Sequence, residues 1–149
     1  RKPDGRELLL YGREPVRVTA PVPSPSTTPL APNAHLRWHP LRGEWVAYAT
    51  HRQHRTFLPP AAYNPLAPTT DPAHPTELPS GQYDVAVFEN LFPALTGLAH
   101  DPPDLAGIPT RPAHGACEVV VFTTDAQGSL GSLPLDHLAL IVDVWAQRY

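Results

Sequence analysis

The sequence predicts an α+β fold, with a mostly antiparallel sheet, one long helix packed on it and long proline-rich loops. Short apolar or alternating runs, typical of strands, recur along the chain, whereas residues 135–149 have the periodicity of a helix. The chain has 149 residues, of which 21 are proline. Proline cannot donate a hydrogen bond to a ladder, so the proline-rich stretches are expected to be loops and not helix or central strand.

The first half of the chain contains one weak and one clear strand signal. Residues 6–18 alternate weakly and are expected to hold a short strand or two, and residues 19–33 to form a surface loop. Polar and apolar side chains alternate in residues 44–50 (EWVAYAT), and the turn signal Leu-Arg-Gly precedes them, so a hairpin is expected over residues 36–50. Residues 57–82 are expected to be a long loop.

The second half contains the remaining elements. Residues 83–89 and 116–123 are predicted strands, and the three consecutive valines of the latter indicate burial on both faces. Pro134 and Asp136 suit the first turn of a helix over residues 135–149. The expected sheet has about five strands. The apolar residues of the helix recur with the helical period and form its expected buried stripe. The residues of this stripe are Leu138, Ile141, Val142 and Trp145.

Composition excludes several classes of protein. The formal net charge of -3 argues against a general nucleic-acid binder, which needs a basic face. Cys117 is the only cysteine, which excludes an intrachain disulfide and fits a cytoplasmic location. No apolar run approaches the ~20 residues that span a bilayer.

Two segments carry a family resemblance. Residues 36–55 read LRWHPLRGEWVAYATHRQHR, and residues 84–95 read DVAVFENLFPAL. Together they resemble the N-terminal half of the galactose-1-phosphate uridylyltransferase family, a branch of the histidine-triad (HIT) superfamily, and the resemblance covers about residues 36–149. The matching residues are Arg37, Pro40, Leu41, Gly43, Trp45, His51, Arg52 and Arg55 in the first segment, and Phe88, Glu89, Asn90, Phe92, Pro93 and Leu95 in the second.

The resemblance implies a HIT-like fold, with residues 1–35 as an N-terminal extension that is largely loop and residues 36–149 as the N-terminal domain, expected to be truncated at the C-terminus. It implies the exchange of UMP between UDP-glucose and galactose 1-phosphate, in two steps through a nucleotide bound to histidine. No His-x-His occurs in the sequence, so no catalytic residue is assigned and this chain alone is expected to be inactive. The implied partners are UDP-hexose and hexose 1-phosphate, the C-terminal half of the enzyme and a second copy of the chain.

The resemblance also implies a substrate-binding site. Arg52 and Arg55 would contact the phosphates, Asn90 the uridine or ribose, and Phe92 and Val119 would wall the base. The chemistry agrees, because guanidinium is a good fork for phosphate oxygens and an amide both donates and accepts. The alternative without a binding role is that the two arginines are solvent-exposed at the end of a strand and that Phe92 is a core residue.

A zinc site of the family is expected to be lost. Many members have a Cys-x-x-Cys between the two segments and a histidine after the valine-rich strand. Alignment places Asn64 and Ala67 at the cysteine positions and Ala126 at the histidine position. Zinc prefers thiolate and imidazole ligands, so no metal and no other cofactor is predicted, and proline rigidity and packing are expected to hold the loop instead.

Two other functions stay open at this stage. The first is a related nucleotide phosphorylase or adenylyltransferase of the same superfamily, because the two segments do not exclude adenine. The second is a non-catalytic module for nucleotide binding or dimerisation.

Overall fold

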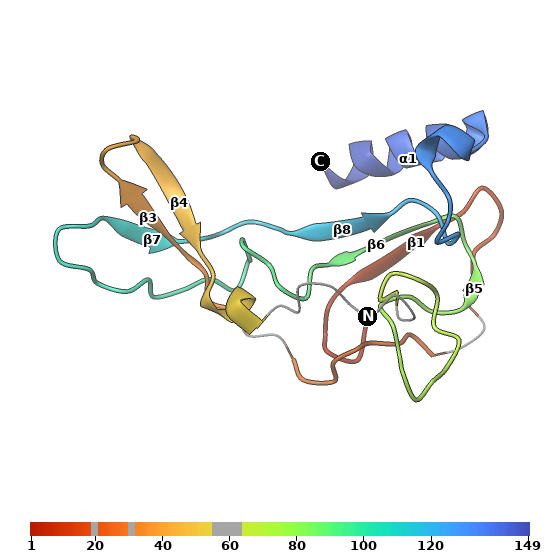
Figure 1. Cartoon of the computed structure of the whole chain (residues 1–149), viewed down its shortest axis with the longest axis horizontal. Helices are drawn as coiled ribbons and strands as arrows, with labels where there is room; N and C mark the ends of the chain where they lie inside the picture. Colours follow the sequence, from red (N-terminus) through yellow and green to blue (C-terminus); the bar gives the residue numbers. More distant parts are fainter. Residues whose placement is uncertain (19–20, 30–31, 55–63) are drawn as a thin grey trace. The chain divides into compact units, whose positions relative to one another are not determined.

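The computed structural model describes residues 1–18, 21–29, 32–54 and 64–149. It confirms the α+β class, with short strands, two 3-10 helices and one α-helix among the described residues (Figure 1). None of these helices is both long and apolar enough to cross a membrane. The elements are β1 (Leu8–Tyr11), β2 (Arg17–Val18), β3 (His35–His39), β4 (Glu44–Tyr48), η1 (Thr50–His54), β5 (Gly81–Gln82), β6 (Val85–Glu89), β7 (Thr110–Pro112), β8 (Glu118–Val121), η2 (Leu130–Ser132) and α1 (Leu135–Arg148).

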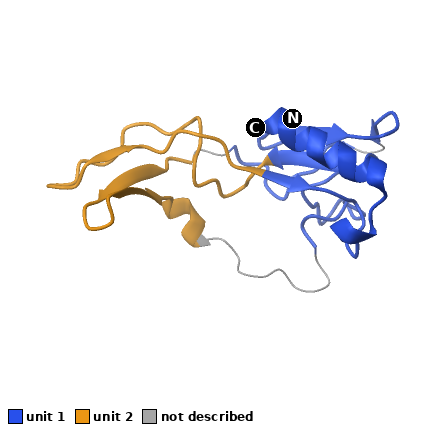
Figure 2. Ribbon diagram, turned by 90° about the horizontal axis from the view of Figure 1, so that it is seen from above, with its two compact units in different colours: residues 1–29, 58–88, 119–149 blue, residues 30–57, 89–118 orange. Residues whose placement is uncertain are grey.

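The expectation of one sheet with about five strands is wrong. The described strands form three small sheets, with the orders β1-β6-β8, β2-β5 and β4-β3-β7. The chain divides into two compact units, and residues 1–29, 58–88 and 119–149 form unit 1 while residues 30–57 and 89–118 form unit 2 (Figure 2). Proline-rich stretches separate the strands, so each described strand is short and the pairing is divided among several sheets.

The main sheet of unit 1 is built from strands that are distant in the sequence. β1 pairs antiparallel with β6, and Leu8 lies opposite Phe88 while Tyr11 lies opposite Val85. The expected weak strand in residues 6–18 is therefore β1, and it belongs to the same sheet as the two apolar strands. Since β6 is the central strand, residues 85–88 are almost fully buried.

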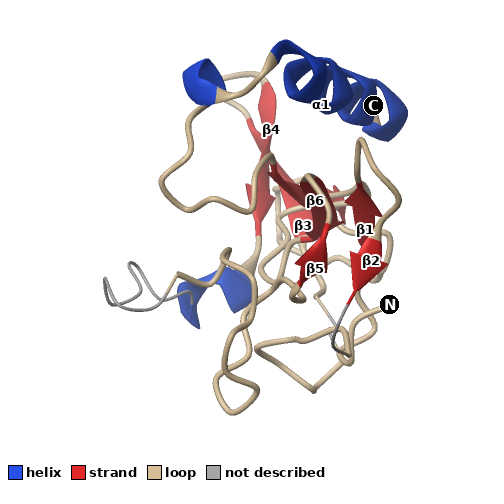
Figure 3. Ribbon diagram, turned by 90° about the vertical axis from the view of Figure 1, so that its right-hand side faces the viewer, coloured by secondary structure: helices blue, strands red, loops and turns tan. Residues whose placement is uncertain are grey.

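The two faces of this sheet are covered by different segments. On one face, α1 packs over β1 and β6 (Figure 3), and Ile141 and Val144 contact Val85 and Val87 in one buried cluster. On the other face, Ala86 and Phe88 cluster with Leu78 and Tyr83, which lie outside the sheet. Alternate residues of β6 thus serve opposite faces, as the period of two in a strand requires.

The strand β8 was predicted to be buried on both faces, and its residues are half-buried. Val119 and Val121 pack against one cluster, and Val120 packs against the other, so both faces of the strand do have apolar neighbours. β8 is half-buried because it lies beside β6 at the end of the strand order.

Helix α1 begins where expected, but its buried face is rotated from the predicted one. The buried residues are His137, Ile141 and Val144, whereas the side chains of Val142 and Trp145 are largely exposed. Leu138 is partly buried, as expected. The apolar arc of this helix is wider than the face that the sheet covers, so periodicity alone could not decide which side of the arc packs inward.

Unit 2 contains the predicted hairpin. β3 pairs with β4 so that Trp38 lies opposite Trp45, and Gly43 closes the turn at a φ of 65°, in the left-handed region that glycine adopts without strain. β7 pairs with the other side of β3. Its last residue is Pro112, and its place at the edge of the order β4-β3-β7 agrees with the missing N–H of proline.

Aromatic and cationic side chains lie on both faces of this hairpin sheet. The indoles of Trp38 and Trp45 meet edge to face with ring centroids 5.6 Å apart, and the guanidinium of Arg111 lies 4.2 Å from the Trp45 ring. On the opposite face, the guanidinium of Arg37 lies 4.0 Å from the ring of Tyr48. All three strands keep half-exposed side chains, so neither face of this sheet is a closed core.

Candidate functional site

The first feature of the site is a tight turn that follows β4. Residues 50–54 form the 3-10 helix η1, and the N–H of Arg52 donates to the carbonyl of Ala49. This turn directs two side chains to one stretch of backbone. His51 Nε2 lies 2.7 Å from the carbonyl oxygen of Pro93, and Arg52 Nη1 donates to the carbonyl of Phe92 at 2.6 Å.

The second feature is the turn that follows β6. The backbone N–H of Asn90 donates to the carbonyl of Cys117, and its side-chain Oδ1 accepts the N–H of Phe92 at 2.9 Å. The side chain of Asn90 therefore closes an Asx turn, which shapes the backbone whose carbonyls receive His51 and Arg52. The N–H of Leu95 also points at Cys117, with 3.4 Å between the nitrogen and Sγ.

The structure thus brings together part of the predicted site. Arg52, Asn90 and Phe92 meet in unit 2, although they come from segments that are separated by almost forty residues in sequence. Val119 belongs to unit 1, where it packs against the cluster of Leu78 and Phe88. Arg55 lies outside the described residues.

Each of these contacts has a consequence for chemistry. The hydrogen bond through Nη1 fixes the position of the Arg52 guanidinium. This group carries five N–H donors in a planar fork, which is well suited to phosphate oxygens. Asn90 uses Oδ1 in the turn, and its NH₂ is the part of the side chain with donors for a ligand. His51 matches the family segment, but the sequence assigned no role to it. In the structure its ring contacts the Pro93 carbonyl and so helps to hold the Phe92–Pro93 backbone.

A second polar site, in unit 1, was not foreseen from the sequence. A pocket of about 340 Å³ is lined by Arg13, Glu14, Gln82, Tyr83, Asp84 and Asp136. Arg13 donates to Asp84 at 3.0 Å and to Asp136 at 2.9 Å. Burial opposes ionisation of Asp84, but the hydrogen bonds from Arg13 outweigh it and lower the pKa of this carboxyl. Three carboxylates and one guanidinium line the pocket, which makes it a poor receptor for a phosphate.

The residues at the expected zinc positions do not fit the metal. Asn64 Oδ1 accepts the N–H of Leu66 at 3.0 Å, and the side chains of Ala67 and Ala126 offer no ligand atom. Within the described ranges, no group of three or more His, Cys, Asp or Glu side chains could hold a metal ion.

Comparison with known proteins identifies the family of this chain. Residues 27–149 match the family model of the galactose-1-phosphate uridyl transferase N-terminal domain. The chain belongs to this family.

Several curated proteins are similar to it. Galactose-1-phosphate uridylyltransferase of Streptomyces lividans is 33% identical over 97% of this chain and 36% of its own length. The enzymes of the same name from Thermotoga maritima and Rattus norvegicus are 33% and 30% identical, over 76% and 75% of this chain and 34% and 33% of their own lengths. The chain therefore spans about a third of the length of these relatives. No solved structure matches it significantly.

Proposed function

We propose that this chain is the nucleotide-binding N-terminal part of an enzyme that exchanges UMP between UDP-glucose and galactose 1-phosphate. Family membership supports the reaction, because the similar proteins carry the name of that activity. The observation that carries the site is the convergence of η1 and the turn after β6, where Arg52 donates to the Phe92 carbonyl and Asn90 closes the same turn.

In this proposal the residues have separate roles. Arg52, together with Arg55, binds the diphosphate of the UDP-sugar through charge-assisted hydrogen bonds. Asn90 donates through its NH₂ to the uridine or ribose, and Phe92 walls the base. No step of the chemistry is assigned to a side chain of this chain, since the sequence contains no His-x-His.

The finer assignments belong to the same proposal. They are a HIT-like fold, as the resemblance implies, and a homodimer. The half-exposed aromatic faces of the β4-β3-β7 sheet, which are suited to a protein interface, support the homodimer. A cytoplasmic location is supported by the single cysteine.

The test compares two ligands by calorimetry in the complete polypeptide that carries this chain. Arg52→Ala is expected to weaken UDP-glucose binding by about 1.5–3 kcal/mol, as for hydrogen bonds to charged groups, and to weaken uridine binding far less. Arg42→Ala is the matched control, because Arg42 lies in the same unit and its side chain is 67% exposed in a pair with Glu44.

Asn90 allows the binding role to be separated from the structural one. Asn90→Asp keeps an oxygen that can accept the Phe92 N–H but removes the NH₂ donors. It should therefore preserve the melting temperature and weaken both uridine and UDP-glucose, whereas Asn90→Ala should also loosen the turn. The site assignment is wrong if Arg52→Ala and Asn90→Asp both bind UDP-glucose as tightly as the unmodified protein does.

A comparison of UDP-glucose with ADP-glucose separates the proposed enzyme from a related adenylyltransferase or phosphorylase. Tighter binding of UDP-glucose is expected. Equal or tighter binding of ADP-glucose would favour the adenine-specific alternative, and failure to bind either sugar nucleotide would favour a non-catalytic module for dimerisation.

A further inference from the structure

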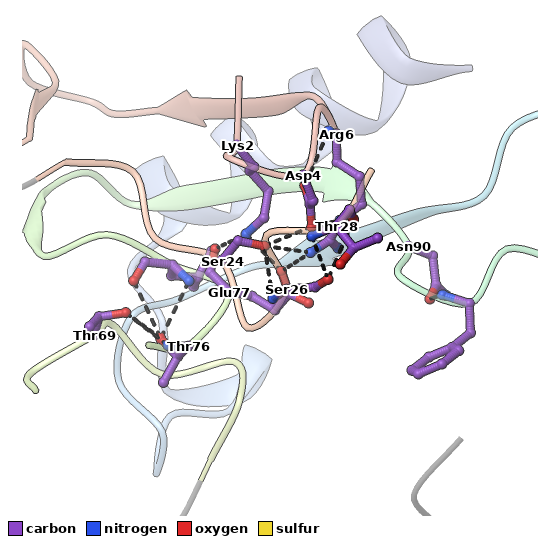
Figure 4. Close-up of polar contacts among 12 residues, drawn as sticks. Lys2, Asp4, Arg6, Ser24, Ser26, Thr28, Thr69, Thr76, Glu77 and Asn90 are labelled. Atoms are coloured by element: carbon purple, nitrogen blue, oxygen red, sulfur yellow. Dashed lines mark hydrogen bonds and ion pairs between the residues drawn. The ribbon is translucent and has the colours of Figure 1, made fainter. Parts of the chain in front are cut away.

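Unit 1 contains a cluster of buried charges near the N-terminus. Lys2, Asp4, Arg6 and Glu77 are each at most 5% exposed. Lys2 Nζ and Arg6 Nη2 both lie 2.7 Å from Glu77 Oε2, and Arg6 Nε donates to Asp4 Oδ2 at 2.8 Å (Figure 4). The hydroxyl of Ser24 donates to Asp4 at 2.7 Å. Two cations and two anions thus neutralise one another away from water, which is the condition for burying charge.

The cluster joins three segments of the chain to the main sheet. Lys2 and Arg6 come from the N-terminus, Ser24 from the following proline-rich stretch and Glu77 from the loop before β5. Both cations lie over the ring of Phe88 in β6, with Lys2 Nζ 5.3 Å from its centroid and Arg6 Cζ 5.9 Å from it. The proline-rich loop is therefore tied to the central strand through Glu77.

Glu77 and its neighbour Thr76 also hold the turn that would carry the Cys-x-x-Cys in a zinc-binding relative. The backbone N–H of Glu77 donates to the carbonyl of Pro65 at 2.9 Å, and the Thr76 hydroxyl donates to the carbonyl of Ala67 at 2.6 Å. Within the turn, the N–H of Ala67 donates to the carbonyl of Asn64 at 3.1 Å.

The partners of Glu77 lie outside the part of the chain that the family model matches. The family match begins at residue 27, whereas Lys2, Asp4, Arg6 and Ser24 all precede it. An N-terminal segment expected from the sequence to be largely loop is thus built into unit 1, through β1 and through these buried ion pairs.

We infer that the charge cluster and the Thr76 hydroxyl form a metal-free clasp, which fastens residues 64–80 to the sheet at the position where the family resemblance implies a zinc site. Residues 1–24 supply half of this clasp and are therefore an integral part of unit 1. The inference rests on the side chains of this chain and is independent of which nucleotide the enzyme binds.

The test measures amide hydrogen exchange of residues 64–80 in the protein purified without chelator. Thr76→Val removes one hydroxyl and nearly preserves shape. It should speed exchange by roughly fivefold or more at the Leu78 amide, which donates to this hydroxyl, and at the Ala67 amide, whose turn this hydroxyl holds through the Ala67 carbonyl. Exchange in β1 and β6 should stay unchanged. Adding a zinc chelator to the unmodified protein should alter neither exchange nor melting temperature, and elemental analysis should find well under one zinc per chain.

Glu77→Gln is the stronger perturbation, because it removes the one carboxylate that contacts both buried cations. Arg6 keeps its ion pair with Asp4, whereas Lys2 loses its ion pair with Glu77. The matched control is Glu44→Gln, which removes the same charge from an exposed pair with Arg42. The expected result is a large fall in melting temperature for Glu77→Gln and almost none for Glu44→Gln. If Glu77→Gln does not fold, Thr76→Val decides the question. Unchanged loop exchange in Thr76→Val, or a loop that loosens when chelator is added, would overturn the inference.

Discussion

Two valines that lie two positions apart on α1 provide a sharp test of how this helix packs. Val144 is 0% exposed and belongs to the cluster with Val85, Val87 and Ile141, whereas Val142 is 58% exposed. The same substitution, Val→Ala, is therefore expected to have very different effects at the two positions.

The magnitude follows from what each substitution removes. Val144→Ala takes away the equivalent of two methylenes from a buried site, which is worth about 1.6 kcal/mol of transfer free energy at ~0.8 kcal/mol per methylene. The cavity left between helix and sheet adds to this, so a loss of about 2–3 kcal/mol in the free energy of unfolding is expected. Val142→Ala removes little buried area and replaces a β-branched residue by the best helix former, so its effect should lie within about 0.5 kcal/mol of zero.

Urea denaturation of both variants, followed by circular dichroism, measures these differences, and an unchanged slope would show that the denatured states are comparable. Equal losses at the two positions, or a larger loss at Val142, would refute the packing described here. Such a result would favour the stripe that periodicity predicted.

Two further predictions concern ionisation. The pKa of Asp84 is lowered in the folded protein, because hydrogen bonds from Arg13 outweigh burial, so its stabilisation is present above the ordinary value of about 3.9 and is lost as pH falls through the folded pKa. Asp84→Asn should flatten this acid limb in a plot of melting temperature against pH, and an unaltered profile would count against the Arg13–Asp84 contact. Burial raises the pKa of Tyr83 to about 12, and its hydroxyl donates to the Pro79 carbonyl at 2.7 Å. Stability should therefore fall as pH rises from about 10, where the unfolded side chain ionises, toward that value. Tyr83→Phe should remove this dependence and the phenolate step near pH 12 in an absorbance titration. Ionisation of Tyr83 near pH 10 would contradict its burial.

Elements with strong local signals were predictable from the sequence. The hairpin of β3 and β4 was predictable, because alternating polar and apolar residues and a glycine turn mark it locally. Helix α1 was predictable, because its apolar periodicity and the proline before its first residue both indicate a helix there. The division into several sheets was not predictable, because pairing partners such as β1 and β6 are remote in sequence and a four-residue strand carries little pattern.

The candidate site was predictable in part. The family segments pointed to Arg52, Asn90 and Phe92, and the structure brings these residues together, but the carbonyl contacts that join them depend on backbone geometry that residue type does not specify. The charge cluster of Lys2, Asp4, Arg6 and Glu77 was missed for a different reason. Charged residues near a terminus are usually solvated, and only the three-dimensional placement of Glu77 reveals that these are buried. The alternating charges KPDGR at residues 2–6 were the one available signal.

Uridylyl exchange in the complete polypeptide tests the proposed function most directly. Labelled galactose 1-phosphate is mixed with UDP-glucose, and formation of labelled UDP-galactose together with glucose 1-phosphate is followed. The proposal predicts transfer of label that depends on UDP-glucose, is not supported by ADP-glucose and is strongly reduced by Arg52→Ala but not by Arg42→Ala. Transfer that ADP-glucose supports equally well, or no transfer by a folded protein, would contradict it.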